Sequence, residues 1–107
     1  MRFETTPAFA ADWKRLDAAE RAAFRAVVPA FSEACDRRVA DPGSVWPGSL
    51  RVRPLVNARG IFELTWSFAG PDGRATWEWT TVRLDDGDAA PAVRWRRIGG
   101  HAVFREP

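Results

Sequence analysis

The residues best suited to acid–base chemistry lie near the end of the chain. His101 is the only histidine among 107 residues, and it follows a pair of glycines that close an arginine-rich segment. An imidazole exchanges a proton near neutral pH, and an arginine fork grips a phosphate through two hydrogen bonds. We therefore expect either phosphate-ester chemistry at His101, assisted by Arg94, Arg96 and Arg97, or the structural role that a lone histidine more often has.

The chain offers few other reactive groups. Cys35 is the only cysteine, which excludes an internal disulfide and a cysteine-rich zinc site. It continues the apolar stripe of a predicted helix, so we expect a buried structural thiol rather than a nucleophile. The acidic run Asp85-Asp86-Gly87-Asp88 does not complete the ligand pattern of a calcium loop, and we expect no metal ion and no other cofactor.

Length and composition narrow the class of protein. The 107 residues suit one domain, residues 1–107, and a content of 46% hydrophobic and 28% charged residues excludes a disordered or fibrous chain. No apolar run approaches the ~20 residues of a membrane helix, and the polar start of the chain is unlike a secretory signal, so we expect a cytoplasmic protein. The net charge of +2 is too small for bulk attraction to nucleic acid. Lys14 is the only lysine, and this excess of arginine reflects either a GC-rich genome or a need to grip phosphate.

Two helices are predicted to follow a short edge strand. The strand covers residues 2–6, where Pro7 ends it, and the first helix spans residues 9–16. Asp17 and Glu20 have the spacing of a capping box, which begins a longer second helix. The apolar residues of this helix recur at steps of three and four: Phe24, Val27, Val28, Phe31 and Cys35.

The second half of the chain has the pattern of a strand meander. Strands are predicted at residues 50–56, 61–68, 74–80 and 92–98. Turns at 57–60 and 70–73 separate the first three, and a mobile surface loop is expected at 83–91. We predict an α+β fold, with two N-terminal helices packed on one face of a twisted antiparallel sheet of about four to five strands.

Alternation along the strands divides the sheet into an apolar face and a charged face. Trp66, Trp77, Trp79 and Trp95 fall in the apolar register, so we expect them in the core rather than stacked on bases. The opposite face carries seven charged residues: Arg51, Arg53, Glu63, Arg74, Glu78, Arg94 and Arg96. This face is either a solvated surface with weak Arg–Glu pairs or a concave basic platform for an RNA backbone.

Four short segments together carry a resemblance to a known protein family. They are Ile98-Gly99-Gly100-His101-Ala102-Val103-Phe104, Gly60-Ile61-Phe62-Glu63-Leu64, Asp72-Gly73-Arg74-Ala75-Thr76-Trp77, and the helix junction formed by Leu16, Asp17 and Arg21. Each is similar to the corresponding part of the RelE/ParE superfamily of bacterial toxins, and the last strand and tail resemble the branch with a C-terminal Gly-x-His motif. The resemblance spans most of the chain.

The resemblance implies a RelE-like fold and a ribosome-dependent mRNA endonuclease that a cognate antitoxin protein holds inactive. Cleavage would need no metal, because the 2′-hydroxyl of the RNA attacks the adjacent phosphate. His101 matches the general acid or base of such enzymes, Arg97 an arginine that steadies the phosphorane, and Phe104 an aromatic residue that stacks on the target base. Contacts with mRNA or ribosomal RNA would come from Arg51, Arg53, Arg74 and Arg96.

Some positions depart from that pattern. Gly100 replaces a small polar residue, Ala102 stands where an acid is common, and the chain has no tyrosine. A ParE-type gyrase inhibitor and a non-catalytic RelE-like binding protein therefore remain alternatives, and the oligomeric state is left open. Strict alternation turns Arg97 toward the core, so its assigned role requires a β-bulge or a strand end near Arg96-Arg97.

Overall fold

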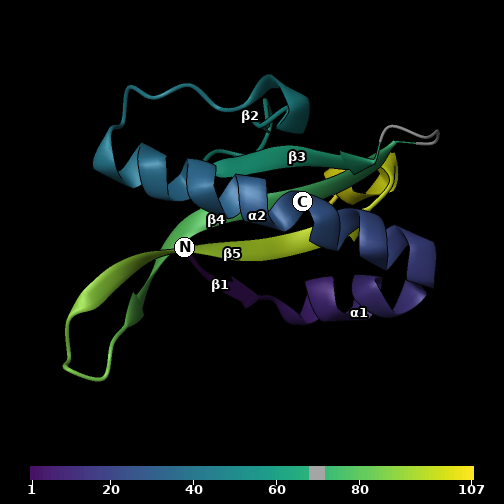
Figure 1. Cartoon of the computed structure of the whole chain (residues 1–107). Helices are drawn as coiled ribbons and strands as arrows, with labels where there is room; N and C mark the ends of the chain where they lie inside the picture. Colours follow the sequence, from purple (N-terminus) through teal and green to yellow (C-terminus); the bar gives the residue numbers. More distant parts are fainter. Residues whose placement is uncertain (68–71) are drawn as a thin grey trace.

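The computed structural model describes residues 1–67 and 72–107, and in these residues the chain forms a five-stranded sheet with two α-helices (Figure 1). Its elements in chain order are β1 (Arg2–Thr5), α1 (Pro7–Arg15), α2 (Ala18–Ala40), the 3-10 helix η1 (Gly48–Leu50), β2 (Arg53–Pro54), β3 (Ile61–Ser67), β4 (Gly73–Arg83), β5 (Ala89–Gly99) and the 3-10 helix η2 (His101–Phe104). The strand order in the sheet is β1-β5-β4-β3-β2. The predicted α+β class is confirmed.

One strand pair differs from the predicted antiparallel sheet. β1 pairs with β5 in parallel, while β2–β3, β3–β4 and β4–β5 are antiparallel. The two helices separate β1 from the rest of the sheet in sequence, so β1 is free to join the far edge beside the last strand. The later strands are separated by too few residues for a crossover, so their neighbours are antiparallel.

Local signals position both helices. The Thr6 hydroxyl accepts a hydrogen bond from the Phe9 backbone N–H at 3.1 Å, and Pro7 begins α1 two residues before the predicted start. The predicted capping box is confirmed: the Asp17 carboxylate accepts from the Glu20 N–H at 2.7 Å, and the Glu20 carboxylate accepts from the Asp17 N–H at 2.9 Å.

The core lies between the helices and the sheet, and it is rich in aromatic rings. Phe24 of α2 meets Trp95 with ring centroids 5.1 Å apart, and Phe31 meets Trp77 at 5.0 Å. Such edge-on and tilted ring pairs stabilise a core beyond the area they bury. Trp66, Trp77 and Trp95 are buried as predicted, and Trp79 is half-buried. Cys35 is also buried among these residues, as predicted, and its burial raises the pKa of the thiol to about 12.

One predicted strand is wrong, and one predicted loop is shorter than expected. Instead of a strand at residues 50–56, the chain makes the turn η1, Arg51 adopts a left-handed conformation with φ 48°, and only Arg53–Pro54 pairs with β3. The loop predicted at 83–91 is limited to residues 84–88, because β4 continues to Arg83 and β5 begins at Ala89. The Asp and Gly residues of this connection favour a tight hairpin turn. Within it the Leu84 N–H donates to the Asp88 carbonyl at 2.7 Å, and Gly87 has a φ of 89°.

Part of the predicted turn between the third and fourth strands lies outside the described residues. This applies to the predicted strand residue Phe68 and to the turn residues Gly70 and Pro71. Within residues 1–67 and 72–107, no helix has the length and apolar character needed to span a membrane.

Candidate functional site

A β-bulge interrupts β5 at the arginine pair that the sequence analysis singled out. Thr76 of β4 is opposite Arg97, but the next residue, Trp77, is opposite Trp95, so Arg96 is an extra residue on β5. Both Trp95 and Ile98 therefore face the core, and the side chains of Arg96 and Arg97 both leave it. This is the irregularity that a functional role for Arg97 required.

The side chain of Arg97 is held by Asp12 of α1. The Arg97 Nε and Nη2 atoms donate to the two carboxylate oxygens at 2.6 and 3.0 Å, and the Ile98 backbone N–H donates to Asp12 Oδ2 at 3.1 Å. Burial alone would raise the pKa of Asp12, but these hydrogen bonds and the charges of Arg97 and Arg15 outweigh it and lower the pKa below its usual value. The hydrogen bond to Asp12 also raises the pKa of Arg97. Arg97 is thus a paired cation in this structure.

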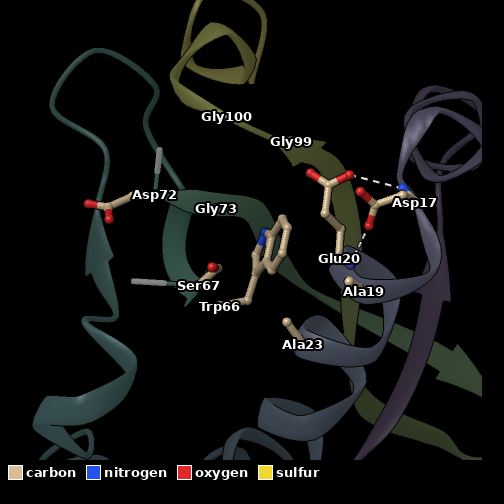
Figure 2. A pocket seen from close by; sticks show the side chains of 10 residues that line it. All are labelled: Asp17, Ala19, Glu20, Ala23, Trp66, Ser67, Asp72, Gly73, Gly99 and Gly100. Carbon is tan, nitrogen blue, oxygen red and sulfur yellow. Dashed lines mark hydrogen bonds between the residues drawn. The ribbon is translucent and has the colours of Figure 1, made fainter. Parts of the chain in front are cut away.

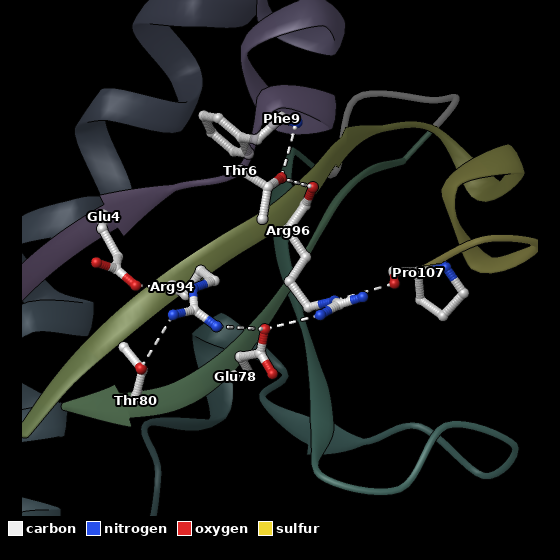
Figure 3. Close-up of polar contacts among 8 residues, drawn as sticks. All are labelled: Glu4, Thr6, Phe9, Glu78, Thr80, Arg94, Arg96 and Pro107. Atoms are coloured by element: carbon white, nitrogen blue, oxygen red, sulfur yellow. Dashed lines mark hydrogen bonds and ion pairs between the residues drawn. The ribbon is translucent and has the colours of Figure 1, made fainter.

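The start of α1 also fastens the bulge. β1 stops pairing with β5 at Thr5, and the Thr6 hydroxyl then donates to the Arg96 carbonyl oxygen at 2.7 Å, while it caps α1 (Figure 3). Two residues further along β5, the Asp12 carboxylate accepts a hydrogen bond from the Ile98 N–H. Side chains of Thr6 and α1 therefore satisfy backbone groups of β5 that a longer β1 would otherwise pair.

Arg94 and Arg96 form a polar network on the face of the sheet away from the helices (Figure 3). The Glu78 carboxylate accepts from Arg96 Nη1 at 2.7 Å and lies 3.5 Å from Arg94 Nη1. Glu4 accepts from Arg94 Nε at 2.7 Å, and Thr80 from Arg94 Nη2 at 3.2 Å. Partly exposed pairs of this kind contribute little to stability, but they leave both guanidinium groups matched by carboxylates.

His101 begins η2 and is exposed. Its ring meets the ring of Phe104 edge-on, with centroids 5.6 Å apart and an interplanar angle of 76°. Within the described part of the chain, no hydrogen bond or ring contact joins His101 to Arg97, whose partners are Asp12 and the Glu106 carbonyl oxygen. The two predicted catalytic side chains are therefore close in sequence but are not in contact.

Residues 100–107, here called the C-terminal segment, cover part of the charged face. η2 packs on β4 and β5, Val103 is buried, and the Pro107 carbonyl accepts from Arg96 Nε at 3.1 Å. Beneath this face Thr65 and Thr76 are fully buried. The Arg–Glu pairs expected on a solvated face are present, but the expectation that the centre of this face is open, either to solvent or as a platform, is wrong.

The remaining predicted RNA-binding residues do not form one surface. Arg74 is 5% exposed and pairs with Asp72 at 3.2 Å, so the expectation that it points outward into solvent is wrong. Arg53 is exposed, but its Nε lies 2.6 Å from the buried carboxylate of Glu63. Arg51 is exposed at the left-handed turn that precedes β2. Alternation identified the outward side of each strand but carried no information on what covers it.

Two cavities border the C-terminal segment or its start. One, of about 470 Å³, lies between the N-terminus of α2, the end of β3 and the start of β4, and Gly99 and Gly100 line it (Figure 2). Its Asp17 and Glu20 carboxylates are partners in the capping box. Among the described residues, no group of three His, Cys, Asp or Glu side chains could hold a metal ion.

The second cavity, of about 400 Å³, lies between residues 55–58 and the C-terminal segment. Phe104 and Arg105 line one side of it, and Asn57 lines the other. Arg105 is exposed and no hydrogen bond or ion pair of its guanidinium occurs within the described residues. Phe104, which lines this cavity, also meets the ring of His101, while His101 itself is not a lining residue.

Asp12 is the site residue that the sequence analysis missed. It lies three residues after the buried Phe9 on α1, so the two share a helix face, and an acid on that face must be buried. A buried carboxylate needs hydrogen-bond donors, which the arginine-rich strand supplies. The i, i+3 relation to Phe9 was therefore the signal available.

Comparisons of this chain with protein-family models, with curated proteins and with solved structures find no match.

Proposed function

We propose that this protein is the toxin of a toxin–antitoxin system, a metal-free endoribonuclease that cleaves mRNA on the ribosome with His101 as its general acid or base. The observation that carries the proposal is the exposed imidazole of His101, set against Phe104, a residue that lines a cavity together with Arg105. The motif resemblance of residues 98–104 and the α+β fold support it. A cytoplasmic location and a cognate antitoxin belong to the same proposal.

The reaction asks for two proton transfers and a compensating positive charge. A base removes the proton of the 2′-hydroxyl, the oxygen attacks the adjacent phosphorus, and the 5′-oxygen leaves with a proton from an acid. His101 supplies one of these transfers. Because Arg97 is paired with Asp12, we assign the phosphate contact to Arg105, the exposed guanidinium that lines the cavity beside Phe104. Arg51 and Arg53 lie outside the covered centre of the face and would contact RNA or ribosome.

The test maps mRNA 5′ ends by primer extension shortly after induction in cells. The wild-type chain, His101→Ala and a matched control, Arg37→Ala, are compared. Arg37 is an exposed arginine in the last turn of α2, far from the C-terminal segment. New ends within translated regions should occur for the wild type and the control and be absent for His101→Ala. A folded wild-type protein that produces no new ends would remove the endonuclease proposal.

A second candidate is a RelE-like binding protein without catalysis. The observation that favours it is the pairing of every arginine of the β5 run with a carboxylate: Arg94 with Glu4, Arg96 with Glu78, and Arg97 with Asp12. This candidate predicts that His101→Ala has no effect, while Arg51→Glu together with Arg53→Glu abolishes binding to the ribosome or partner. Induction of the DNA-damage response without RNA cleavage would instead indicate a gyrase inhibitor.

A further inference from the structure

We infer that Asp12 is a positioning residue: it sets the place of the C-terminal segment, and so of His101, through its grip on Arg97 and on the backbone of Ile98. The consequence for RNA cleavage rests on the proposed function, whereas the positioning itself does not. Asp12 touches neither His101 nor the cavity that Phe104 lines, and it lies on α1, 85 residues away from Arg97 in sequence.

The carboxylate of Asp12 is buried, so its charge is stable there only if hydrogen-bond donors surround it. Asp12 is 6% exposed, and a buried charge is tolerated when it is paired and hydrogen-bonded. Its three donors are Nε and Nη2 of Arg97 and the Ile98 N–H, at 2.6, 3.0 and 3.1 Å. Two parallel bonds to one carboxylate fix the plane of the guanidinium as well as its position.

The orientation of that plane determines where the third nitrogen points. Arg97 Nη1 donates to the Glu106 carbonyl oxygen at 3.0 Å, and the neighbouring Arg96 holds the Pro107 carbonyl oxygen at 3.1 Å. The C-terminal segment is thus fastened at both ends, by Ile98 before it and by these carbonyls at its far end. Without Asp12 the Ile98 N–H loses its acceptor and Arg97 loses the fork that aims Nη1 at Glu106, while the bond from Arg96 to Pro107 remains.

Between its two ends the C-terminal segment has little of its own to hold it. Gly99 and Gly100 precede His101, and Val103 is the only buried side chain of the segment. One short 3-10 turn adds few backbone hydrogen bonds. The contact of His101 with Phe104 is an i, i+3 pair within this turn, and a single 3-10 turn is weak by itself, so the contact persists only while the end fastenings keep the turn formed.

The only histidine of the chain provides a direct readout, because its imidazole signals in an NMR spectrum need no assignment. The edge-on ring of Phe104 shifts those signals by its ring current. Phe104→Ala gives the reference position without that contact. We expect Asp12→Ala and Asp12→Asn to move the His101 signals toward the Phe104→Ala position.

The matched control is Glu4→Gln. Glu4 also forms an ion pair between the N-terminal part of the chain and β5, to Arg94 at 2.7 Å, but neither residue reaches the C-terminal segment. In the Glu4→Gln variant the His101 signals should stay at the wild-type position. A purely structural role for Asp12 lowers the unfolding temperature without moving the signals of the folded variant, so the shift separates positioning from stability.

Cleavage kinetics supply the second readout. A displacement of about 1 Å at a reacting group lowers the rate about 100-fold, so Asp12→Ala should reduce kcat by about that factor and leave KM close to the wild-type value. Asp12→Asn keeps an acceptor for the Ile98 N–H and should lose less. If Asp12→Ala does not fold, Arg97→Lys replaces it, because lysine keeps the charge and cannot form the fork.

Each outcome bears on one hypothesis. Folded Asp12 variants whose His101 signals remain at the wild-type position overturn the inference. If the wild-type chain cleaves no RNA, the proposed function fails, and the NMR comparison still decides whether Asp12 positions His101. If His101→Ala abolishes cleavage while Asp12→Ala cleaves at the wild-type rate, the proposed function stands and the inference is wrong.

Discussion

Replacement of Gly73 by alanine should destabilise the protein through one contact. Gly73 begins β4, and a Cβ atom at this position would lie 2.4, 2.5 and 2.6 Å from the Cε2, Cζ2 and Cδ2 atoms of Trp66. Carbon atoms pack best about 3.5–4.0 Å apart, so the ring would have to retreat by about 1 Å. Trp66 is 5% exposed and meets Phe24 edge-on with ring centroids 6.5 Å apart. It also lines the cavity of about 470 Å³, so the ring can shift, but at the expense of its packing against Phe24.

The size of the effect follows from two opposing terms. Overpacking of a well-packed core costs about 1–3 kcal/mol. Alanine in place of glycine recovers about 0.4–1 kcal/mol by restricting the unfolded chain. The difference between the two is a net loss of about 1 kcal/mol in the free energy of unfolding, compared with the roughly 5–15 kcal/mol typical of a domain. The melting temperature should fall by about 4–8 °C for each kcal/mol lost.

Urea unfolding followed by tryptophan fluorescence and circular dichroism measures this difference. Gly48→Ala is the matched control, because a Cβ atom at residue 48 would have no other atom within 4 Å and the backbone there is not left-handed. The double variant Trp66→Leu/Gly73→Ala should lose less unfolding free energy than the two single variants lose together. The difference, which is the coupling energy, should be about 0.5–3 kcal/mol. A Gly73→Ala protein as stable as the wild type would refute the packing argument.

Three further predictions concern Asp12, Cys35 and Thr6. Because the pKa of Asp12 is lowered in the folded protein, its contribution to stability is present above about pH 4 and is lost as the pH falls through the folded-state pKa. Urea unfolding should therefore show the difference in unfolding free energy between wild type and Asp12→Asn narrowing as the pH is lowered below about 4. Cys35, whose burial raises the thiol pKa to about 12, should resist a thiol reagent in the folded protein and react once urea unfolds it; reaction at equal rates would contradict its burial. Thr6→Val should cost about 1–2 kcal/mol of unfolding free energy because both the α1 cap and the bond to the Arg96 carbonyl are lost, whereas Thr6→Ser should retain most of it.

The parts of the fold that depend only on residues close in sequence were predictable. The capping box of Asp17 and Glu20 is a local arrangement of two side chains and two backbone groups, so its spacing alone located the start of α2. The apolar stripe of α2 and the tryptophan register of the strands depend only on helix and strand periods, and Phe24, Phe31, Trp77 and Trp95 are buried accordingly.

The errors have a common origin in longer-range geometry. The left-handed Arg51 and the turn before it interrupt a run whose alternation suggested a strand, because propensity does not report whether a neighbour is available to pair. The acidic hairpin between β4 and β5 resembles a loop in sequence, because Asp and Gly are typical of both. The parallel pairing of β1 with β5 depends on where two helices return the chain, which no local pattern encodes.

The candidate site was predictable as a list of residues but not as an arrangement. His101 and Phe104 were identified by residue type and are in contact. Alternation puts Arg74 on the charged side of its strand, yet the residue is buried and its guanidinium pairs with Asp72. Whether a polar face is exposed to solvent depends on which segment of the chain covers it, and only the three-dimensional structure shows that.

The arginines of β5 show how this affects a functional argument. An arginine grips phosphate only when its donors are not already used by a carboxylate, and carboxylates from β1, α1 and β4 engage Arg94, Arg96 and Arg97. Their charges are compensated, so β5 attracts an anion less than its composition suggests. In the proposed function, positive charge for RNA would come from outside the strand, from Arg105 at the cavity that Phe104 lines and from the β2 side of the sheet. The arginine-rich strand acts first as the anchor of the C-terminal segment, and an active site at His101 would use the strand for geometry more than for charge.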